Sequence, residues 1–305
     1  MLLRDKIRVI VAGSTGMLGK DIVSIFSNDK NYELFGISRH DCMNKVINYK
    51  HYICDMTNFH ELGRILDEID PQIIIDSVAN TDVEQCEMNR QYTYLLHVGS
   101  AEILSLYKSD RTKIIYISTD AVFDGMKGNY SEEDEVNPIN YYSETKLTGE
   151  KRTMEINRDA LILRTNLYGY HVPMKNSFVE WAIKNWKSEK RINGYSDVYF
   201  NPLYSSQLAK IIYVIVKEKN INGILNVGCK QSISKYRFLA ILADQIGIPN
   251  DFIKSSSIDD VGYFAKRPKN TTLNLSKYQS LFSDTPDIYQ GINELTEDLK
   301  KEGWL

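Results

Sequence analysis

The residues Ile7-Arg8-Val9-Ile10-Val11-Ala12, followed at once by Gly13-Ser14-Thr15-Gly16-Met17-Leu18-Gly19, decide the fold of this chain. The first six are β-rich and predict a buried strand, and the apolar spacing from residue 18 to residue 26 predicts an amphipathic helix. Glycine at every third position allows a tight turn and a close approach of the backbone to a pyrophosphate. The arrangement favours dinucleotide binding at a helix N-terminus, although strand-to-helix turns also use glycine for steric reasons alone.

Strand and helix patterns alternate through the first half of the chain. Strands are expected at residues 7–12, 33–38, 51–54, 73–75, 113–117 and 161–163. Helices are expected between them and later at 178–186, 205–217 and 288–300, with a further strand at 224–227. Continuous apolar strands spaced by helices predict a parallel sheet covered on both faces.

We therefore expect an α/β fold with a Rossmann-like, doubly wound parallel sheet and a smaller, discontinuous C-terminal substrate lobe. Residues 1–167 and 203–228 are expected to form the NAD(P)-binding domain. Residues 168–202 and 229–305 are expected to form the lobe.

Composition narrows the classes of function. The chain has 305 residues, 43% of them apolar and 25% charged, as in an ordinary globular protein. A net charge of −3 supplies no basic field for a nucleic acid. No apolar run approaches the roughly 18 residues that span a bilayer. Because the first residues are already strand-like, we expect no signal peptide. We expect a cytoplasmic protein with no membrane or nucleic-acid partner.

The four cysteines, Cys42, Cys54, Cys86 and Cys229, lie far apart and lack the spacing of a zinc site. They are expected to be reduced thiols, and no metal site is expected.

The end of the second strand bears on the choice of cofactor. An acidic residue there would bind the ribose 2′-hydroxyl of NADH, whereas an arginine suits the 2′-phosphate of NADPH. The chain has Ser38-Arg39-His40. Arg39 favours NADPH and leaves NADH possible, and it could also be a solvated loop residue. Asp55, next to Met56, is placed to touch the adenine or to cap the following helix.

Tyr142 stands four residues before Lys146, which places both on one face of a helix. A free tyrosine has a pKa of about 10, and we expect the Lys146 ammonium to lower that of Tyr142. The same lysine can bind the nicotinamide ribose. Thr119, in Ser118-Thr119-Asp120 at the end of the fifth strand, would hold a substrate carbonyl. A tyrosine four residues before a lysine occurs often by chance. Here the pair follows the glycine loop and Thr119 in the sequence, and this combination is specific.

These segments resemble the extended short-chain dehydrogenase/reductase family, and within it the dTDP-4-dehydrorhamnose reductases, the RmlD-like sugar-nucleotide reductases. The matching segments are 13–19, 79–87, 118–125, 142–150, 163–169 and 267–270. The resemblance implies reduction of the C4 ketone of a 4-keto-6-deoxy sugar nucleotide, as in dTDP-L-rhamnose synthesis for cell-surface polysaccharides. Tyr142 would donate the proton.

The site residues expected from the residues and the resemblance together fall into three groups. The catalytic residues are Thr119, Tyr142 and Lys146. The cofactor would be bound by Gly13, Thr15, Gly16, Met17, Leu18, Gly19, Ser38, Arg39, Asp55, Met56, Ala79, Asn80, Tyr142 and Lys146. The sugar nucleotide would be bound by Thr81, Asp120, Asn176, Phe178 and Arg267. Asn176 could instead be a helix cap, and Arg267 a surface residue beside Pro268.

The chain departs from the family pattern in two places. His97 stands where these enzymes usually carry an Asn that supports the catalytic lysine through water, and the charge of a histidine would vary near neutral pH. The loop at residues 200–204, expected to shape the sugar pocket, also differs from the usual Gly-x-Pro-Thr element.

Three alternatives remain beside the reductase. A 4,6-dehydratase would need a Glu where Ala121 stands, which disfavours it. Another reductase or an epimerase of sugar nucleotides stays open. So does a non-catalytic NADP-binding regulatory subunit, as in relatives that serve methionine adenosyltransferase. A homodimer is open as the state of assembly.

Overall fold

The computed structural model describes residues 6–41 and 49–305, so Cys42 lies outside the described residues. The chain divides into two compact units, which we describe one at a time. The first comprises residues 1–118, 140–163 and 209–224, and the second comprises 119–139, 164–208 and 225–305. The domain boundaries expected from the sequence stay a prediction.

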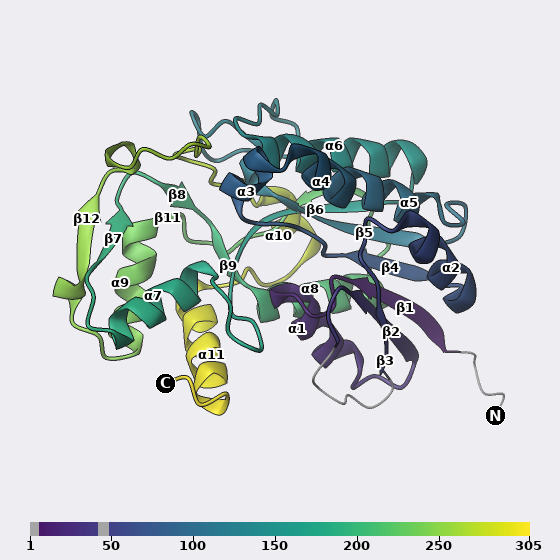
Figure 1. The fold of residues 1–305 in the computed structure, drawn as a ribbon, viewed down its shortest axis with the longest axis horizontal. Helices are drawn as coiled ribbons and strands as arrows, with labels where there is room; N and C mark the ends of the chain where they lie inside the picture. The colour runs from purple at the N-terminus through teal and green to yellow at the C-terminus, as the bar shows by residue number, and fades with distance from the viewer. Residues whose placement is uncertain (1–5, 42–48) are drawn as a thin grey trace. The chain divides into compact units, whose positions relative to one another are not determined.

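A parallel sheet in the order β3-β2-β1-β4-β5-β6 confirms the expected α/β, Rossmann-like fold (Figure 1). β10 lies next to β6. The strands are β1 (Ile7–Ala12), β2 (Tyr32–Ser38), β3 (Tyr49–Ile53), β4 (Ile73–Asp76), β5 (Lys113–Thr119), β6 (Leu161–Tyr168) and β10 (Gly223–Asn226). In register, Val9 of β1 lies between Leu34 and Ile73.

Helices of the first unit cover both faces of this sheet. Alternate strand side chains, including Ile10, Ile37 and Ile74, pack in one buried cluster with residues of α2 and α5. On the other side, Phe26 of α1 meets Tyr213 of α8 edge to face at 5.3 Å. These helices are α1 (Met17–Phe26), α2 (Phe59–Ile69), α5 (Ser100–Leu106), α6 (Tyr141–Ile156) and α8 (Ser205–Glu218).

Between β4 and α5 the chain forms three short helical segments: α3 (Val83–Met88), α4 (Arg90–Tyr94) and the π-helical turn η1 (Leu95–Gly99). A π-turn inside a helical run is rare and is found often at functional sites. Here it carries His97. Both η1 and α5 pack against α6, and the pair α5 and α6 can be seen in Figure 1.

The second unit combines short strands with helices around an aromatic core. Its strand pairs are β8 with β11, β7 with β12, and β9 with the end of β6. Phe200, Phe238 and Trp186 lie in its buried cluster. The strands are β7 (Ile192–Tyr195), β8 (Tyr199–Phe200), β9 (Pro202–Tyr204), β11 (Ile233–Ser234) and β12 (Ile253–Ser256). The helices are η2 (Asp120–Val122), α7 (Phe178–Lys187), α9 (Lys235–Gln245), η3 (Asn250–Phe252), η4 (Ile258–Asp260), α10 (Ser276–Leu281) and α11 (Ile288–Lys301).

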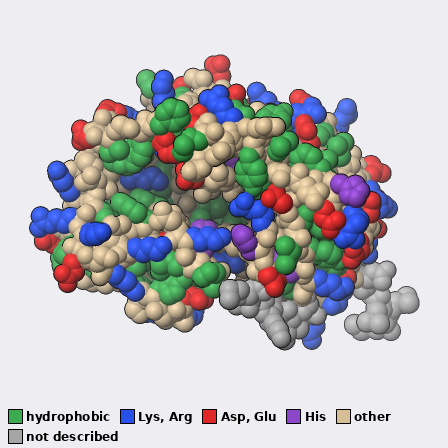
Figure 2. Space-filling view, viewed as in Figure 1, with side chains coloured by type: hydrophobic (Ala, Val, Ile, Leu, Met, Phe, Trp, Pro, Cys, Tyr) green, Lys and Arg blue, Asp and Glu red, His purple; other side chains and the backbone are tan. Residues whose placement is uncertain are grey.

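Charged side chains of both signs are mixed over the face drawn in Figure 2, in keeping with the small net charge. Within residues 6–41 and 49–305, no helix is long and apolar enough to cross a membrane. In the same residues, no cluster of three or more His, Cys, Asp or Glu side chains is arranged to hold a metal. Among the described residues, Cys54, Cys86 and Cys229 are buried and form no disulfide.

Candidate functional site

The glycine loop of the first unit is built for close backbone approach. Gly13 adopts a φ of +81°, and a Cβ placed on Gly19 would lie 2.2 Å from the carbonyl oxygen of Gly13. Gly16 starts α1 without a side-chain cap, and the first turn of the helix carries no acidic residue. The positive end of α1 therefore fits a phosphate group, as expected from Gly13, Gly16 and Gly19.

Arg39 follows β2 and is exposed to solvent, but its side chain also makes a contact with the protein. Its Nη1 donates a hydrogen bond to the hydroxyl of Tyr92 on α4 at 2.9 Å. Ser38, beside it, donates to the carbonyl oxygen of His40. The end of β2 thus presents an anchored guanidinium, which suits a 2′-phosphate.

Asp55 does not cap the helix that follows it, so that alternative is wrong. Its Oδ1 accepts hydrogen bonds from the backbone N–H and the hydroxyl of Thr57, at 2.9 and 2.7 Å. Asn58 is the N-cap of α2 and accepts from the N–H of Glu61. The prediction that Asp55 touches the adenine stays open.

His97 connects the loop after β4 to the helix that carries Tyr142. Its Nε2 accepts a hydrogen bond from the backbone N–H of Asn80 at 2.9 Å. Nδ1 therefore carries the proton and donates to Thr145 Oγ1, also at 2.9 Å. The ring of His97 meets the ring of Tyr142 edge to face at 5.7 Å.

The expectation that the charge of His97 varies near neutral pH is wrong. Burial lowers the pKa of His97 to about 3, and the Lys146 ammonium acts in the same direction. The residue is 1% exposed. His97 is therefore a neutral link between Asn80 and α6 at physiological pH.

Lys146 lies fully inside the first unit. Its Nζ lies 4.0 Å from the ring centroid of Tyr116 and has no hydrogen-bond partner in the described residues. Burial lowers the pKa of Lys146 to about 8, while the carboxylates of Asp76 and Glu150 act against that shift. A buried ammonium with unused donors fits a ribose hydroxyl of a nicotinamide cofactor, because an unpaired buried donor is costly.

The expected site residues fall in both units. Asn80, Tyr142 and Lys146 come together in the first unit, around His97. Ala79 and Thr81 lie exposed beside Asn80. Thr119 ends β5 and belongs to the second unit, so its place relative to Tyr142 stays a prediction.

Within the second unit, Asp120 anchors three segments to one another. It is 1% exposed, and its carboxyl oxygens accept hydrogen bonds from Asn166 Nδ2 at 3.0 and 2.9 Å and from Thr271 Oγ1 at 2.5 Å. Thr119 Oγ1 donates to it at 3.3 Å. Burial raises the pKa of Asp120, and these donors act against the shift. The sequence pattern assigned no role to Asn166 or Thr271, although both lie in or beside matching segments.

Segments 118–125 and 267–270, far apart in the sequence, pack together in this unit. The backbone N–H of Asn270 donates to the carbonyl of Gly125 at 3.0 Å. Gly125 has a φ of +77°, and a Cβ there would lie 2.6 Å from Cβ of Pro268. This contact requires glycine at position 125, because a side chain there would collide with Pro268. The packing therefore constrains the residues of both segments.

The remaining substrate candidates also lie in the second unit. Asn176 is exposed and is not a helix cap, since Ser177 caps α7 in a capping box with Glu180. The guanidinium of Arg267 lies 5.0 Å from the ring centroid of Tyr263 and donates to the carbonyl of Ala265. Phe178 starts α7, and its ring lies under the ammonium of Lys235.

Lys235 is a residue that the sequence reasoning missed. Its ammonium also exerts an electrostatic influence on Asp120, so it lies near two of the predicted substrate residues. The only signal in the sequence was its place directly after Ser234, the N-cap of α9.

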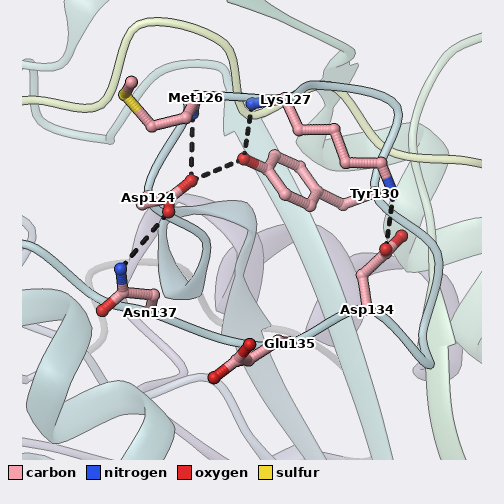
Figure 3. Close-up of a pocket in the computed structure, with 7 residues that line it drawn as sticks. All are labelled: Asp124, Met126, Lys127, Tyr130, Asp134, Glu135 and Asn137. Carbon is pink, nitrogen blue, oxygen red and sulfur yellow. Dashed lines mark hydrogen bonds and ion pairs between the residues drawn. The ribbon is translucent and has the colours of Figure 1, made fainter.

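A surface hollow formed within residues 124–137 is lined by seven residues, shown in Figure 3. Asp124 accepts hydrogen bonds there from the N–H of Met126, the hydroxyl of Tyr130 and the amide of Asn137. Lys127 pairs with Asp134. These polar groups bind one another. Their hydrogen bonds and ion pair stabilise the loop, and few polar groups of the hollow remain to bind a ligand.

Comparison with known proteins shows which family the chain resembles over most of its length. A family model described as the RmlD substrate binding domain matches residues 7–301. A dTDP-4-dehydrorhamnose reductase of Aggregatibacter actinomycetemcomitans is 26% identical over 298 residues, covering 93% of this chain and 96% of that protein. The beta subunit of methionine adenosyltransferase 2 from Rattus norvegicus is 26% identical over 281 residues, covering 90% and 82%.

A solved dTDP-4-dehydrorhamnose reductase of Bacillus anthracis, in complex with NADP, has a similar structure. It is 25% identical and superposes with a TM-score of 0.82, covering 96% of this chain and 99% of that one.

Proposed function

Because the chain belongs to the RmlD substrate-binding domain family, we propose that it is an NADPH-dependent reductase of a 4-keto-6-deoxy sugar nucleotide, with dTDP-4-dehydrorhamnose as the first candidate substrate. The observation that carries this proposal is the buried, unpartnered ammonium of Lys146, four residues after Tyr142 on α6. The similarity to named reductases over most of the chain supports it.

The chemistry divides between cofactor and protein. When bound, NADPH supplies the hydride that reduces the C4 carbonyl carbon. The electron pair of the C=O bond moves to the oxygen, and the hydroxyl of Tyr142 donates the proton that completes the alcohol. The Lys146 ammonium would bind the nicotinamide ribose, and it would stabilise the tyrosinate until solvent reprotonates Tyr142. Thr119 orients the carbonyl oxygen.

Absorbance of NADPH, followed with dTDP-, GDP-, CDP- and UDP-linked 4-keto-6-deoxy sugars, tests the proposal. At least one member should be reduced, and Tyr142→Phe should lower turnover by about a thousandfold or more with little change in NADPH affinity. Tyr141→Phe is the matched control, because Tyr141 lies under the guanidinium of Arg90 and is expected to serve packing alone. Equal turnover by Tyr142→Phe and wild type would refute the assigned proton donor.

A non-catalytic, cofactor-binding subunit is the second candidate function. The similarity to the beta subunit of a methionine adenosyltransferase favours it. Tight NADPH binding without oxidation by any sugar of the panel would select this candidate over the reductase.

A further inference from the structure

Lys235 is half-buried in the second unit, and its ammonium has no hydrogen-bond or ion-pair partner among the described residues. Its backbone N–H donates to the carbonyl of Val198 at 2.9 Å, which holds the first residue of α9 in place. Its Nζ lies 3.9 Å from the ring centroid of Phe200 and 4.8 Å from that of Phe178. The side chain is therefore positioned by packing, while its polar end is unused.

The two rings cannot replace hydrogen-bond acceptors. A cation over an aromatic face is attracted by about 0.5–2 kcal/mol. An ammonium still has three N–H donors, which the rings do not satisfy, and Lys235 is only half-buried, so these donors can be reached from solvent. Burial lowers the pKa of Lys235 to about 8, with the Asp120 carboxylate acting against the shift.

Asp120 is not the missing partner. Its two oxygens already accept hydrogen bonds from Asn166, Thr271 and Thr119. An ionised carboxylate offers about four lone-pair positions, so the protein donors fill it. The donors of Lys235 therefore remain available to water or to a bound ligand.

The surroundings select the chemistry of that group. A phosphate beside the carboxylate of Asp120 would be repelled, whereas a neutral hydroxyl can accept from the ammonium without that cost. Phe200 is 2% exposed, so its ring fixes the position of the ammonium and does not itself contact a ligand. Asp120 also directly follows Thr119, the residue expected to hold the ketone.

We propose that Lys235 is a sugar-specificity residue, which donates hydrogen bonds to hydroxyl groups of the hexose ring of the substrate. This inference rests on the proposed function and adds a contact to it. The segment 200–204, where the sequence was expected to form a loop that departs from the family pattern, instead contains Phe200 at the end of β8 and the strand β9. Lys235 and Phe200 together would give this chain a sugar preference of its own.

Calorimetric titration of the full chain with dTDP and with dTDP-glucose, and with the matching GDP, CDP and UDP pairs, tests the contact. In each pair, the dissociation constant of the nucleoside diphosphate divided by that of the sugar nucleotide measures the gain in affinity that the sugar provides. Lys235→Met should lower this ratio about tenfold, as loss of a charge-assisted hydrogen bond would, and leave the nucleoside diphosphate within about twofold. Lys235→Gln retains N–H donors and should restore part of the ratio.

Arg237→Met is the matched control, since Arg237 is an exposed cation in the same first turn of α9 and should leave both constants unchanged. An unchanged ratio in Lys235→Met would overturn the inference about Lys235 and leave the proposed function standing. Equal losses for diphosphate and sugar nucleotide, in Lys235→Met or in Lys235→Gln, would also overturn it, because the lysine would then act on the phosphates or on the fold. If the wild-type chain binds no pair, the proposed function fails and the sugar contact fails with it.

Discussion

At the scale of single residues, burial determines what His97 can do. A histidine in water changes its charge near pH 6.5, and at that pH it could serve as a switch. His97 is held neutral instead, because it is buried and because Lys146 is close to it. It accepts from Asn80 and donates to Thr145, whose hydroxyl in turn lies 2.9 Å from the carbonyl of Tyr142. The residue fixes the distance between the cofactor-side loop and the start of α6.

The burial of neutral His97 should make the free energy of unfolding depend on pH. The folded-state pKa of His97 is about 3, below the unfolded value of 6.5, so the folded protein binds fewer protons between these values. The stabilisation from the neutral residue is complete above pH 6.5 and decreases below it, by up to about 1.4 kcal/mol per pH unit. Urea unfolding at pH 7, 6 and 5 should show this slope in the wild type.

His97→Gln keeps an acceptor and a donor but does not titrate in this range, so this part of the slope should disappear. His60→Gln, at an exposed histidine, should leave the slope unchanged. Identical slopes in the wild type and His97→Gln would contradict the neutral link.

Arg39 carries the choice between the two nicotinamide cofactors. Its guanidinium is anchored by Tyr92 at the end of β2, where a 2′-phosphate would lie. Arg39→Ala should weaken NADPH binding about tenfold or more and leave NADH binding nearly unchanged. Fluorescence titration with both cofactors measures this, and Tyr92→Phe, which removes only the anchor, should give a smaller loss. An unchanged preference for NADPH in Arg39→Ala would show that another group reads the phosphate.

At the scale of elements, the start of α1 shows how a local pattern becomes a binding surface. The three glycines were recognisable in the sequence because they follow a strand and precede an apolar helix pattern. Their requirement is steric: Gly16 N–H donates to the carbonyl of Gly13, and Gly19 packs against the same carbonyl. The helix end is left without a side-chain cap and is open to a phosphate.

Two glycine-to-alanine changes should therefore have opposite effects. Gly19→Ala places a Cβ against backbone atoms that cannot give way, and we expect loss of NADPH binding and of at least about 1–3 kcal/mol of stability. Gly63→Ala, in α2, meets nothing within 4 Å and should add about 0.5–1 kcal/mol without changing cofactor affinity. Thermal unfolding with and without NADPH measures both. A Gly19→Ala protein that binds NADPH normally would contradict the close-approach argument.

At the scale of the whole molecule, the two units are expected to bind different ligands. The glycine loop, Asn80 and Lys146 lie in the first unit, and Asp120, Phe178 and Lys235 lie in the second. Hydrogen exchange measured by mass spectrometry should show NADPH slowing exchange mainly in peptides that cover residues 13–19 and 79–81. A sugar nucleotide should slow exchange mainly in peptides of the second unit that cover 119–125 and 233–239. Protection by NADPH confined to the second unit would contradict this division.

The sequence by itself determined the strand and helix order, the parallel sheet, the glycine loop and the spacing of Tyr142 and Lys146. These depend on periods of two and 3.6 residues and on turn chemistry, which are local properties of the chain. Family resemblance extended this reading to the residues expected to bind the sugar nucleotide.

Only the tertiary structure decided the neutral state of His97, the isolation of the Lys146 ammonium, the place of Lys235 over two aromatic rings, and the contact between segments 118–125 and 267–270. Each of these depends on burial or on contact between residues far apart in the sequence. Such contacts follow from the path of the whole chain, and the energetic cost of burying a charge depends on what surrounds it there.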